Sequence, residues 1–339
     1  MKKLLFITIL ALVAFVSCSK KETGTAIPSG KITVGFRTGD VSTKAGDGNV
    51  ADGGGIAFDN GLPDLIILVA DSRGELVRKY PENGILQQGA TPTEMAVTFT
   101  GLDEGTYMVY AFANTLGLWD MTSGGSDVSS ITSLTSVSQL QALQFKPVSG
   151  STARVLRNDR LPLSAEGQAS VSEQGNGEVS LEMIRCVAKV SLELENNTGE
   201  SLELDGLDFS IKGINPDRGY VLPIYLPDIP SGTVYGILDG TPGDDIVIED
   251  GSSVTFGYLV FPGEAPDSRY LMDVEFTANS AAAPSRFTDL PVHDDHGVNI
   301  ASLERNNHLH IVTKISKGNV SFNFETAEWA EKTEEVVFD

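Results

Sequence analysis

The sequence predicts an all-β protein made of two tandem β-sandwich domains. Short apolar segments alternate with turn-forming Gly, Pro, Asp and Asn residues along most of the 339-residue chain, a pattern typical of strands and hairpins. Within these segments apolar side chains recur at every second position, as in residues 269–279 (RYLMDVEFTAN), and so lie on one face of a strand. Loss of a 17-residue N-terminal signal would leave 322 of the 339 residues. A single core seldom holds that many residues, so two domains are expected.

The chain opens with a secretion signal of the lipoprotein type. Two lysines precede a run from Leu4 to Val16 that is apolar apart from Thr8, and a serine and Cys18 close it. The run is shorter than the roughly 20 residues of a spanning helix and lacks a stop-transfer flank. The small residue before Cys18 resembles a bacterial lipobox, in which a lipid-directed peptidase cleaves in front of an acylated cysteine. We therefore expect residues 1–17 to be removed and Cys18 to carry lipid; the alternative is an ordinary cleaved signal with an incidental cysteine.

Cysteine usage agrees with a lipid-anchored protein. The chain contains two cysteines, Cys18 and Cys186, so no disulfide is available once Cys18 carries lipid. Cys186 lies on the apolar face of the alternating segment MIRCVAKVSLEL, which predicts inert packing in a half-buried strand. Arg185 and Lys189 are expected on the opposite face, where they would not activate the thiol. Acyl chains, at ~0.8 kcal/mol per buried methylene, would hold the protein on a bilayer, which predicts an anchored surface or periplasmic lipoprotein.

The charge argues against nucleic acid as a partner. The chain carries 24 basic and 46 acidic residues, a formal charge of −22, and loss of two lysines with the signal would make it −24. Such a surface repels phosphate groups. It suits a soluble, outward-facing protein that resists nonspecific association.

The N-terminal domain, expected over residues 31–183, follows a polar, lipidated linker at 18–30. Its first strand is KITVGFR, ending at Arg37, and the loop behind it, TGDVSTKAGDGNVADGGG, has too few apolar residues to pack. Strands follow at PDLIILVAD, EMAVTFTG and GTYMVYAFAN. Apolar residues at every third position between Ser129 and Phe145 predict one short amphipathic helix.

The C-terminal domain, expected over residues 184–339, contains a second series of alternating strands. They are KVSLELEN, SLELDGLDFSIKG, SVTFGYLVFPG, RYLMDVEFTAN, NHLHIVTKIS, NVSFNFET and EEVVFD. Turn residues separate them, as in other sandwiches. The pattern therefore predicts a domain boundary near Met183 and a strand at the end of the chain.

Residue patterns for catalysis or cofactor binding are largely missing, so we expect neither an enzyme nor a cofactor. All four histidines fall between His293 and His310, and the sequence has no nucleophile elbow, phosphate loop or zinc-type cysteine set. The best metal candidate is VHDDHG, residues 292–297. Neighbouring loop residues rarely converge on one ion, which favours a solvated turn and no metal. His308 and His310 share one strand face, expected to meet solvent or a neighbouring loop.

Two acidic loops and one group of aromatic residues each have two interpretations. The loops AGDGNVADGGG and PGDDIVIEDGSS lack the regular ligand spacing and closing glutamate of a calcium site, which favours a plain loop and a hairpin. Tyr107, Tyr110, Phe112 and Trp119 would suit a sugar-stacking face. Alternating aromatics more often fill a sandwich core, and we prefer that interpretation.

Five segments and a closing strand occur in a distinctive order. They are PDLIILVADSRGELVRKYP, GLDEGTYMVYAFANT, RLPLSAEG, EMIRCVAKVSLELENNTG and ERNNHLHIVTKI, followed by a strand that bears Trp329. In this order they resemble the fimbrillin family, the lipoprotein subunits of the type V fimbriae of Bacteroidales bacteria. The resemblance covers almost the whole mature chain. It implies two transthyretin-like β-sandwich domains and a structural role in an adhesive cell-surface fimbrium.

The resemblance also implies an assembly mechanism. A family member is exported as a lipoprotein, an arginine- or lysine-specific protease removes its first strand, and a strand of a neighbouring subunit fills the groove. The matching positions are KITVGF as the removed strand and Arg37 or Lys44 as the processing site. The donated strand matches the C-terminal stretch from Trp329 to the chain end, whose Val336 and Phe338 would enter alternate pockets.

The implied partners and role follow from this mechanism. Partners would be other copies or related fimbrial subunits through β-strand addition, the outer membrane through lipid, and host or bacterial surface ligands. Three roles stay open at this point: a polymerising subunit of the shaft or tip, an anchor that keeps its lipid and first strand, and a glycan-binding surface lipoprotein.

Overall fold

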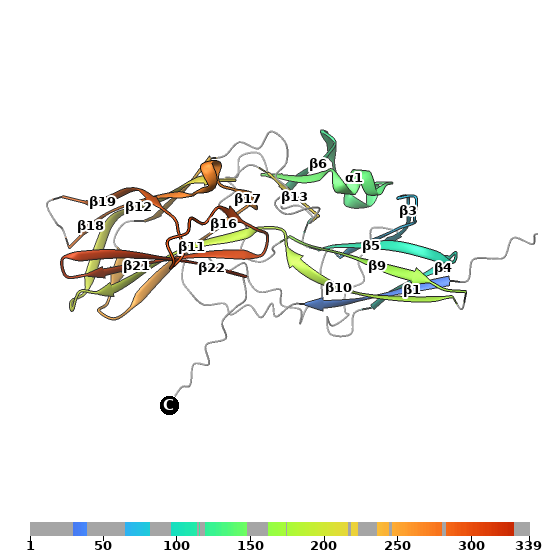
Figure 1. The fold of residues 1–339 in the computed structure, drawn as a ribbon, viewed down its shortest axis with the longest axis horizontal. Helices are drawn as coiled ribbons and strands as arrows, with labels where there is room; N and C mark the ends of the chain where they lie inside the picture. The colour runs from blue at the N-terminus through green and yellow to red at the C-terminus, as the bar shows by residue number, and fades with distance from the viewer. Residues whose placement is uncertain are drawn as a thin grey trace, which may run out of the picture.

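The protein is almost entirely β-structure, which confirms the predicted all-β class. The computed structural model describes residues 30–38, 65–81, 96–113, 115, 119–147, 162–173, 175–215, 218–222, 236–243, 246–279 and 283–328. Figure 1 shows an elongated molecule with the N-terminal strands at one end and the C-terminal strands at the other. None of the helices in these ranges has the length and apolar character that a membrane crossing requires.

Two groups of strands form the N-terminal sandwich. The first group is β4 (Ala96–Leu102), β1 (Gly30–Thr38) and β10 (Asn176–Arg185), hydrogen-bonded in that order. The second group is β3 (Leu76–Tyr80), β2 (Ile66–Ala70), β5 (Gly105–Ala113) and β9 (Leu163–Val171). The end of β10 joins the two groups, because Ile184 and Arg185 pair with β9.

Apolar side chains from both groups fill the space between them. The core contains Ile32 and Val34 of β1, Phe99 of β4, Val109 of β5 and Leu181 of β10, each no more than 6% exposed. Alternate residues of β5 point to opposite sides of its sheet, as the period of a strand requires. The sandwich core is thus built from the alternation seen in the sequence.

The aromatic residues of β5 confirm the core interpretation. Tyr107 belongs to the core between the two groups of strands, and Tyr110 and Phe112 belong to a second cluster on the other side of the sheet. Their exposed fractions are 7%, 3% and 0%. Because these three side chains are buried, they do not form an exposed sugar-stacking face. The side chain of Trp119 lies outside the described residues.

A small sheet and a short helix cover the outer side of β2 and β5. The sheet consists of β7 (Ser126–Val128), β6 (Trp119–Ser123), β8 (Leu143–Pro147) and β13 (Gly219–Tyr220). The predicted helix is shorter than its pattern indicated: a 3-10 turn (Ile131–Ser133) is followed by α1 (Val137–Gln141). Apolar residues spaced by three satisfy a 3-10 turn as well as an α-helix, which explains the difference.

The C-terminal sandwich also has two sheets. One is β16 (Ser253–Val260), β11 (Ala188–Asn197), β21 (Asn307–Ser316) and β22 (Asn319–Glu328). The other is β14 (Gly236–Gly243), β12 (Leu202–Ile214), β18 (Leu271–Ala278) and β19 (Ser285–Pro291), with β15 (Ile246–Ile248) beside β12. A two-stranded ladder of β17 (Gly263–Glu264) and β20 (Ser302–Leu303) and a 3-10 turn (Pro266–Ser268) complete this part. One large apolar cluster lies between the sheets.

The segment around Cys186 differs from its prediction. The prediction of a single strand through MIRCVAKVSLEL is wrong. Strand β10 ends at Arg185, a bend follows at Cys186 and Val187, and β11 starts at Ala188. Arg185 is buried, with its Nη1 atom 3.0 Å from Oδ1 of Asn306, and is not on a solvated face. The bend lets the chain pass from one sandwich into the other. The division into residues 31–183 and 184–339 remains our proposal.

Cys186 itself is fully buried in the cluster at this bend. Its Sγ lies 3.5 Å from Oγ of Ser164 and 3.4 Å from the carbonyl oxygen of Val221. Burial raises the pKa of the thiol, although the nearby Arg305 guanidinium lowers it in part. A buried, protonated thiol packs as a small apolar group, as the sequence indicated.

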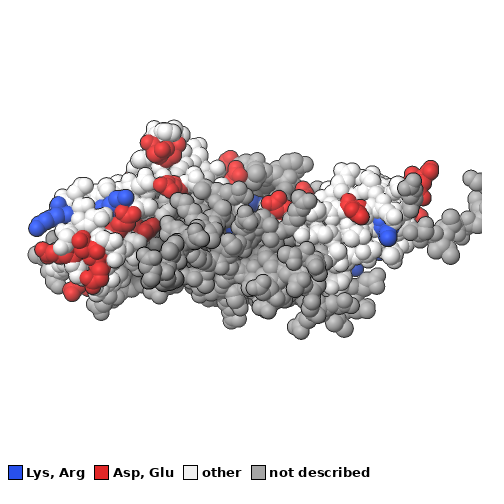
Figure 2. All heavy atoms as spheres, turned by 90° about the horizontal axis from the view of Figure 1, so that it is seen from below, with Lys and Arg blue, Asp and Glu red and all other residues white. Residues whose placement is uncertain are grey.

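Acidic residues outnumber basic residues, 46 to 24, and form visible groups on the described surface. In Figure 2 the acidic side chains form several groups on this face, the largest of them at the end of the molecule formed by the C-terminal sandwich, where basic side chains lie beside them. This distribution agrees with the formal charge of −22. A surface of this sign does not attract a phosphate backbone.

Candidate functional site: the first strand and its slot

β1 is an inner strand with hydrogen-bonded neighbours on both sides. It pairs in parallel with β10, from Lys31 opposite Asn176 to Thr38 opposite Met183. On its other edge it pairs antiparallel with β4. We call the space that β1 fills between β4 and β10 the β1 slot. Emptying this slot would leave two rows of unpaired backbone groups, which is the condition under which a sheet captures another strand.

The inward side chains of β1 are part of the sandwich core. Ile32 and Val34 are both 0% exposed, and Phe36 packs against the same cluster. Lys31 and Thr33 point the other way, and the Thr33 hydroxyl lies 3.2 Å from that of Thr98 on β4. Full burial of an Ile or Val side chain is worth roughly 1.5–3 kcal/mol. β1 therefore contributes directly to the stability of the N-terminal sandwich.

The N-terminal end of the β1 slot is narrow. Gly30 is buried, and a Cβ atom at this position would stand 2.5 Å from both the carbonyl oxygen of Leu102 and Cγ1 of Val171. Gly177 on the neighbouring β10 is similarly confined, because a Cβ there would stand 2.5 Å from the carbonyl oxygen of Ser170. Real Cβ atoms do not approach other atoms so closely. Glycine is therefore required where β1 enters the sheet.

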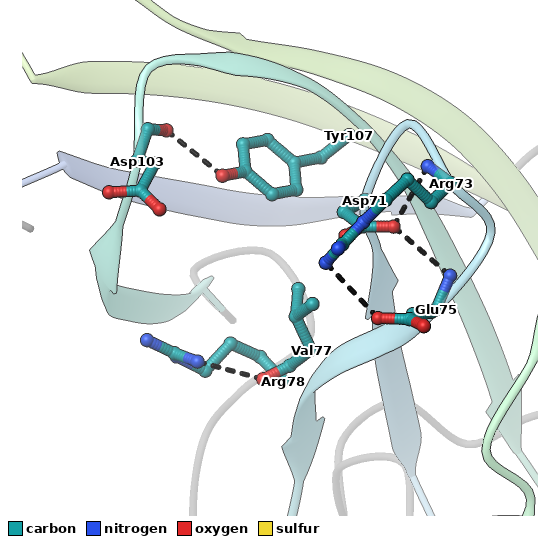
Figure 3. Close-up of polar contacts among 7 residues, drawn as sticks. All are labelled: Asp71, Arg73, Glu75, Val77, Arg78, Asp103 and Tyr107. Carbon is teal, nitrogen blue, oxygen red and sulfur yellow. Dashed lines mark hydrogen bonds and ion pairs between the residues drawn. The ribbon is translucent and has the colours of Figure 1, made fainter.

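β4 forms the outer wall of the slot and is held by Arg78. Among the described residues, β1 is the strand with which β4 pairs. Arg78, on β3 of the opposite group of strands, donates from Nε to the carbonyl oxygen of Thr100 at 3.0 Å and from Nη2 to that of Gly101. Its Nη1 donates to the carbonyl oxygen of Val77 at 2.8 Å, as Figure 3 shows. Arg78 thus ties the outer strands of the two groups together.

Two turns near this wall are fixed by local hydrogen bonds. In Figure 3, the Tyr107 hydroxyl reaches the turn between β4 and β5, where it donates to the carbonyl oxygen of Asp103 at 2.9 Å. In the turn between β2 and β3, the Asp71 carboxylate accepts from the backbone N–H groups of Arg73 and Glu75 and from the Arg73 guanidinium. Burial raises the pKa of Asp71, but these hydrogen bonds outweigh it and lower the pKa overall. Both turns therefore have defined geometry.

Several predicted site residues lie outside the described residues. These are Cys18, Lys44, Trp329, Val336 and Phe338, together with the AGDGNVADGGG loop. Arg37 lies near the end of β1, and its side chain is not among those described. The lipidation, processing and donor-strand assignments therefore remain predictions.

The VHDDHG segment folds as a turn that satisfies its own backbone. Oδ1 of Asp294 accepts from the N–H groups of His296 and Val298 at 2.9 and 2.8 Å. The side chains of Asp295 and His296 are 76% and 80% exposed. Within the part of the chain that the structure describes, no group of three His, Cys, Asp or Glu residues is placed to hold a metal ion.

The expectation that His308 and His310 face solvent or a loop is wrong. Both contact the neighbouring strand β11: Nε2 of His308 lies 2.6 Å from Oγ of Ser191, and Nε2 of His310 lies 2.8 Å from Oε2 of Glu193. Burial lowers the pKa of His308 to about 3. The alternation within one strand does not reveal its neighbour, and the parallel pairing of β11 with β21 supplies these contacts.

The fold resembles those of solved fimbrial and adhesion proteins, each 12% identical to this chain. A candidate cell adhesion protein from Parabacteroides distasonis ATCC 8503 matches with a TM-score of 0.57 over 91% of this chain and 100% of that chain. One from Bacteroides eggerthii DSM 20697 matches with a TM-score of 0.53 over 89% and 96%. The tip fimbrial protein Mfa3 from Porphyromonas gingivalis, with a C-terminal truncation, matches with a TM-score of 0.51 over 89% and 100%. At this identity the similarity shows a shared fold.

Together, the fold and the inserted first strand define the class of the protein, an all-β protein built of β-sandwiches. The family model of the fimbrillin-A associated anchor proteins Mfa1 and Mfa2 matches residues 29–335, and the chain belongs to this family. The resemblance to Bacteroidales fimbrial proteins is thereby confirmed. The family consists of fimbrial and adhesion proteins and not of enzymes, and its members act with other fimbrial subunits at the cell surface. The comparison with curated proteins gave no match.

Proposed function

We propose that this protein is a structural subunit of an adhesive cell-surface fimbria, exported as a lipoprotein and joined to a neighbouring subunit by exchange of its first strand. The observation that carries the proposal is the position of β1. It lies between two strands, fills the sandwich core with Ile32 and Val34, and precedes every other described strand in the chain. One cleavage behind it would separate it from the rest of the sandwich.

Processing at Arg37 or Lys44 would supply that cleavage. Both residues lie between the core positions of β1 and the start of β2 at Ile66. A strand released in this way would expose the core at the β1 slot, at a cost of ~25 cal/mol per Å² of apolar surface. The open backbone edges of β4 and β10 would then favour capture of a replacement strand.

The C-terminal stretch is the proposed donor to a neighbouring subunit. It begins at Trp329, directly after β22, which is the outer strand of its sheet and ends at Glu328. Val336 and Phe338 alternate along it and would occupy inward positions in the neighbour. Lipid on Cys18 would hold the precursor at the outer membrane until this assembly step.

Mass spectrometry of the mature N-terminus tests this function. We expect lipidated Cys18 at the N-terminus of the membrane-bound precursor, and an N-terminus at Thr38, or behind Lys44, in sheared filaments. Lipidated Cys18 in both fractions would contradict exchange of the first strand.

A fimbrial anchor is the second candidate function, and the description of the matching family as anchor proteins favours it. An anchor would retain both its lipid and β1, so the same measurement separates the two roles. The glycan-binding alternative has weaker support, because Tyr107, Tyr110 and Phe112 are buried in cores.

A further inference from the structure

We infer that the β1 slot selects an incoming strand by a glycine at its entry and apolar residues two and four positions further on, and that the chain's own C-terminal stretch fails this selection. The inference rests on the proposed strand exchange and specifies its partner. The strand that replaces β1 would come from a different subunit and not from a second copy of this chain.

The glycine requirement follows from the narrow end of the slot. At position 30 the space for a Cβ atom is already taken by the carbonyl oxygen of Leu102 and by Cγ1 of Val171, each 2.5 Å away. The first obstacle is backbone of β4 and the second is a β-branched side chain of β9, so neither can move aside easily. At position 35 a Cβ atom would have the carbonyl oxygen of Val179 as its nearest neighbour, at 4.0 Å, which is ordinary contact. The restriction therefore acts at the entry of the slot.

The apolar requirement follows from complete burial of the next two inward positions. Ile32 and Val34 are 0% exposed and belong to one continuous core. A charged side chain at either position would lose its hydration without gaining a partner, which is strongly unfavourable. The acceptable pattern is therefore glycine, any residue, apolar, any residue, apolar, with Phe36 as a third, partly buried apolar position.

The C-terminal stretch conflicts with this pattern in its best register. When the stretch runs in the same direction as β1, Val336 can replace Val34 and Phe338 can replace Phe36. Glu334 then takes the fully buried first inward position, and Lys332 takes the position of the glycine. The stretch thus places a carboxylate in the core and a long side chain where no Cβ fits.

Other alignments fail as well. Moving the stretch by two residues, so that Val336 becomes the first inward residue, places Glu334 at the glycine position. Moving it by one residue turns Val337 inward and brings Glu335 to the glycine position or to the first inward position. The stretch could also run in the opposite direction, with Val336 at the position of Val34. Phe338 would then occupy the position of Ile32, where its ring is too large for the space.

Two substitutions should convert the stretch into a fitting strand. Lys332→Gly together with Glu334→Ile changes residues 332–338 from KTEEVVF to GTIEVVF, which matches residues 30–36, GKITVGF, at the glycine and at all three inward positions. The matched control is Thr333→Ser with Glu335→Gln, which alters outward positions in the same register.

The binding test uses the mature full-length chain with a site-specific protease sequence inserted after Lys44. After cleavage, β1 is exchanged in mild denaturant against fluorescent peptides, and binding is followed by anisotropy. We expect the peptide of residues 30–38 to bind, and its Thr33→Ser variant to bind equally well. The Gly30→Val variant and the natural peptide of residues 329–339 should bind at least about 100-fold more weakly, a difference of ~2.7 kcal/mol.

The assembly test uses the same cleaved chain without peptide, separated by size-exclusion chromatography with light scattering. The chain with the natural stretch, or with the control substitutions, should remain monomeric after β1 is released. The chain with Lys332→Gly and Glu334→Ile should form a ladder of oligomers. Equal oligomer formation by the natural chain, or equal binding of the Gly30→Val peptide, would overturn the selection rule while leaving strand exchange intact. Failure of the natural β1 peptide to exchange would overturn both.

Discussion

Nη1 of Arg305 donates a hydrogen bond of 3.0 Å to Oγ of Ser164, and this contact joins the C-terminal sandwich to β9 of the N-terminal one. Nη2 of the same guanidinium lies 3.2 Å from the carbonyl oxygens of Tyr220 and Val221. Arg305 is 9% exposed, and the Ser164 hydroxyl in turn donates to Val221. A buried guanidinium with several acceptors is well satisfied and costly to remove.

Replacing Arg305 should therefore weaken the whole molecule. Arg305→Met keeps much of the side-chain volume but removes the guanidinium hydrogen bonds to Ser164, Tyr220 and Val221, and we expect a loss of ~1–3 kcal/mol in the free energy of unfolding. Denaturant titration measures the loss. Arg286→Met is the matched control, because Arg286 is 64% exposed in its ion pair with Glu275 and should change stability by about 1 kcal/mol or less. Equal effects of the two substitutions would contradict the structural role of Arg305.

Arg78 should control the mobility of the outer wall of the β1 slot. Arg78→Ala removes the hydrogen bonds to the carbonyl groups of Thr100 and Gly101. The free energy of unfolding should fall by ~1–3 kcal/mol. Hydrogen exchange of β4 should accelerate more than that of β5, because β5 has strand neighbours on both sides.

The control for this experiment is Arg73→Ala, which removes a guanidinium that is 72% exposed from the nearby turn. It should leave the hydrogen exchange of β4 unchanged. If hydrogen exchange accelerates equally in all strands of the N-terminal sandwich of the Arg78→Ala variant, then Arg78 contributes general stability and does not hold β4 in place.

Acid should destabilise the protein through His308. Its pKa is lowered to about 3 by burial and by the charges of Lys189 and His310, whereas an unfolded histidine titrates near 6.5. Between these values the unfolded chain binds a proton that the folded chain does not, so stability falls as the pH is lowered below 6.5. The slope for one such group is at most ~1.4 kcal/mol per pH unit.

Glu193 adds to the same trend at lower pH. The hydrogen bond from His310 lowers its pKa, so its contribution to stability is present above its unfolded pKa and is lost as the pH falls through its folded pKa. His308→Gln should flatten the fall between pH 6 and 4, measured by urea unfolding. His296→Gln, at an 80% exposed histidine, should leave it unchanged. A profile that His308→Gln does not alter would assign the acid sensitivity elsewhere.

The strands could be predicted because apolar and polar residues alternate along consecutive positions of a half-buried strand. This alternation identified β1, β5 and β18 as strands, and for β18 also the buried face, from the sequence alone. Contacts between distant segments were not predictable in this way. The pair formed by Arg305 and Ser164 spans 141 residues, and nothing in RLPLSAEG or ERNNHLH indicates that they meet.

The requirement for glycine at the entry of the β1 slot also depends on distant segments and could not be predicted from the sequence. In the sequence, Gly30 is the last residue of a polar linker. In the fold, Leu102 of β4 and Val171 of β9 leave no space for a Cβ atom at this position. Likewise, the parallel pairing of β1 with β10 joins segments far apart in the chain, and the hydrophobic pattern of either strand fits several partners.

The lipid anchor is tested by Cys18→Ala. We expect this change to abolish incorporation of a fatty-acid analogue and to leave the signal segment uncleaved by the lipid-directed peptidase, because the Cys18 thiol is the proposed site of acylation. Metabolic labelling followed by electrophoresis provides the measurement. Cys186→Ala is the control and should label like the wild type, since Cys186 is buried. Labelling of the Cys18→Ala protein at the wild-type level would exclude the lipobox assignment.

Two glycines of β1 provide an internal comparison that needs no cleavage. Gly30→Ala should destabilise the intact chain by ~1–3 kcal/mol, because the new methyl group would stand 2.5 Å from Leu102 and Val171 and must displace them. Gly35→Ala, five residues further along the same strand, meets its nearest neighbour at 4.0 Å and should change stability by about 0.5 kcal/mol or less. Both substitutions remove the same backbone freedom from the unfolded chain, so their difference isolates the space available at each position. Urea unfolding monitored by circular dichroism gives both values. If the two variants are equally stable, the slot is not closed at its entry, and the glycine would no longer distinguish one incoming strand from another.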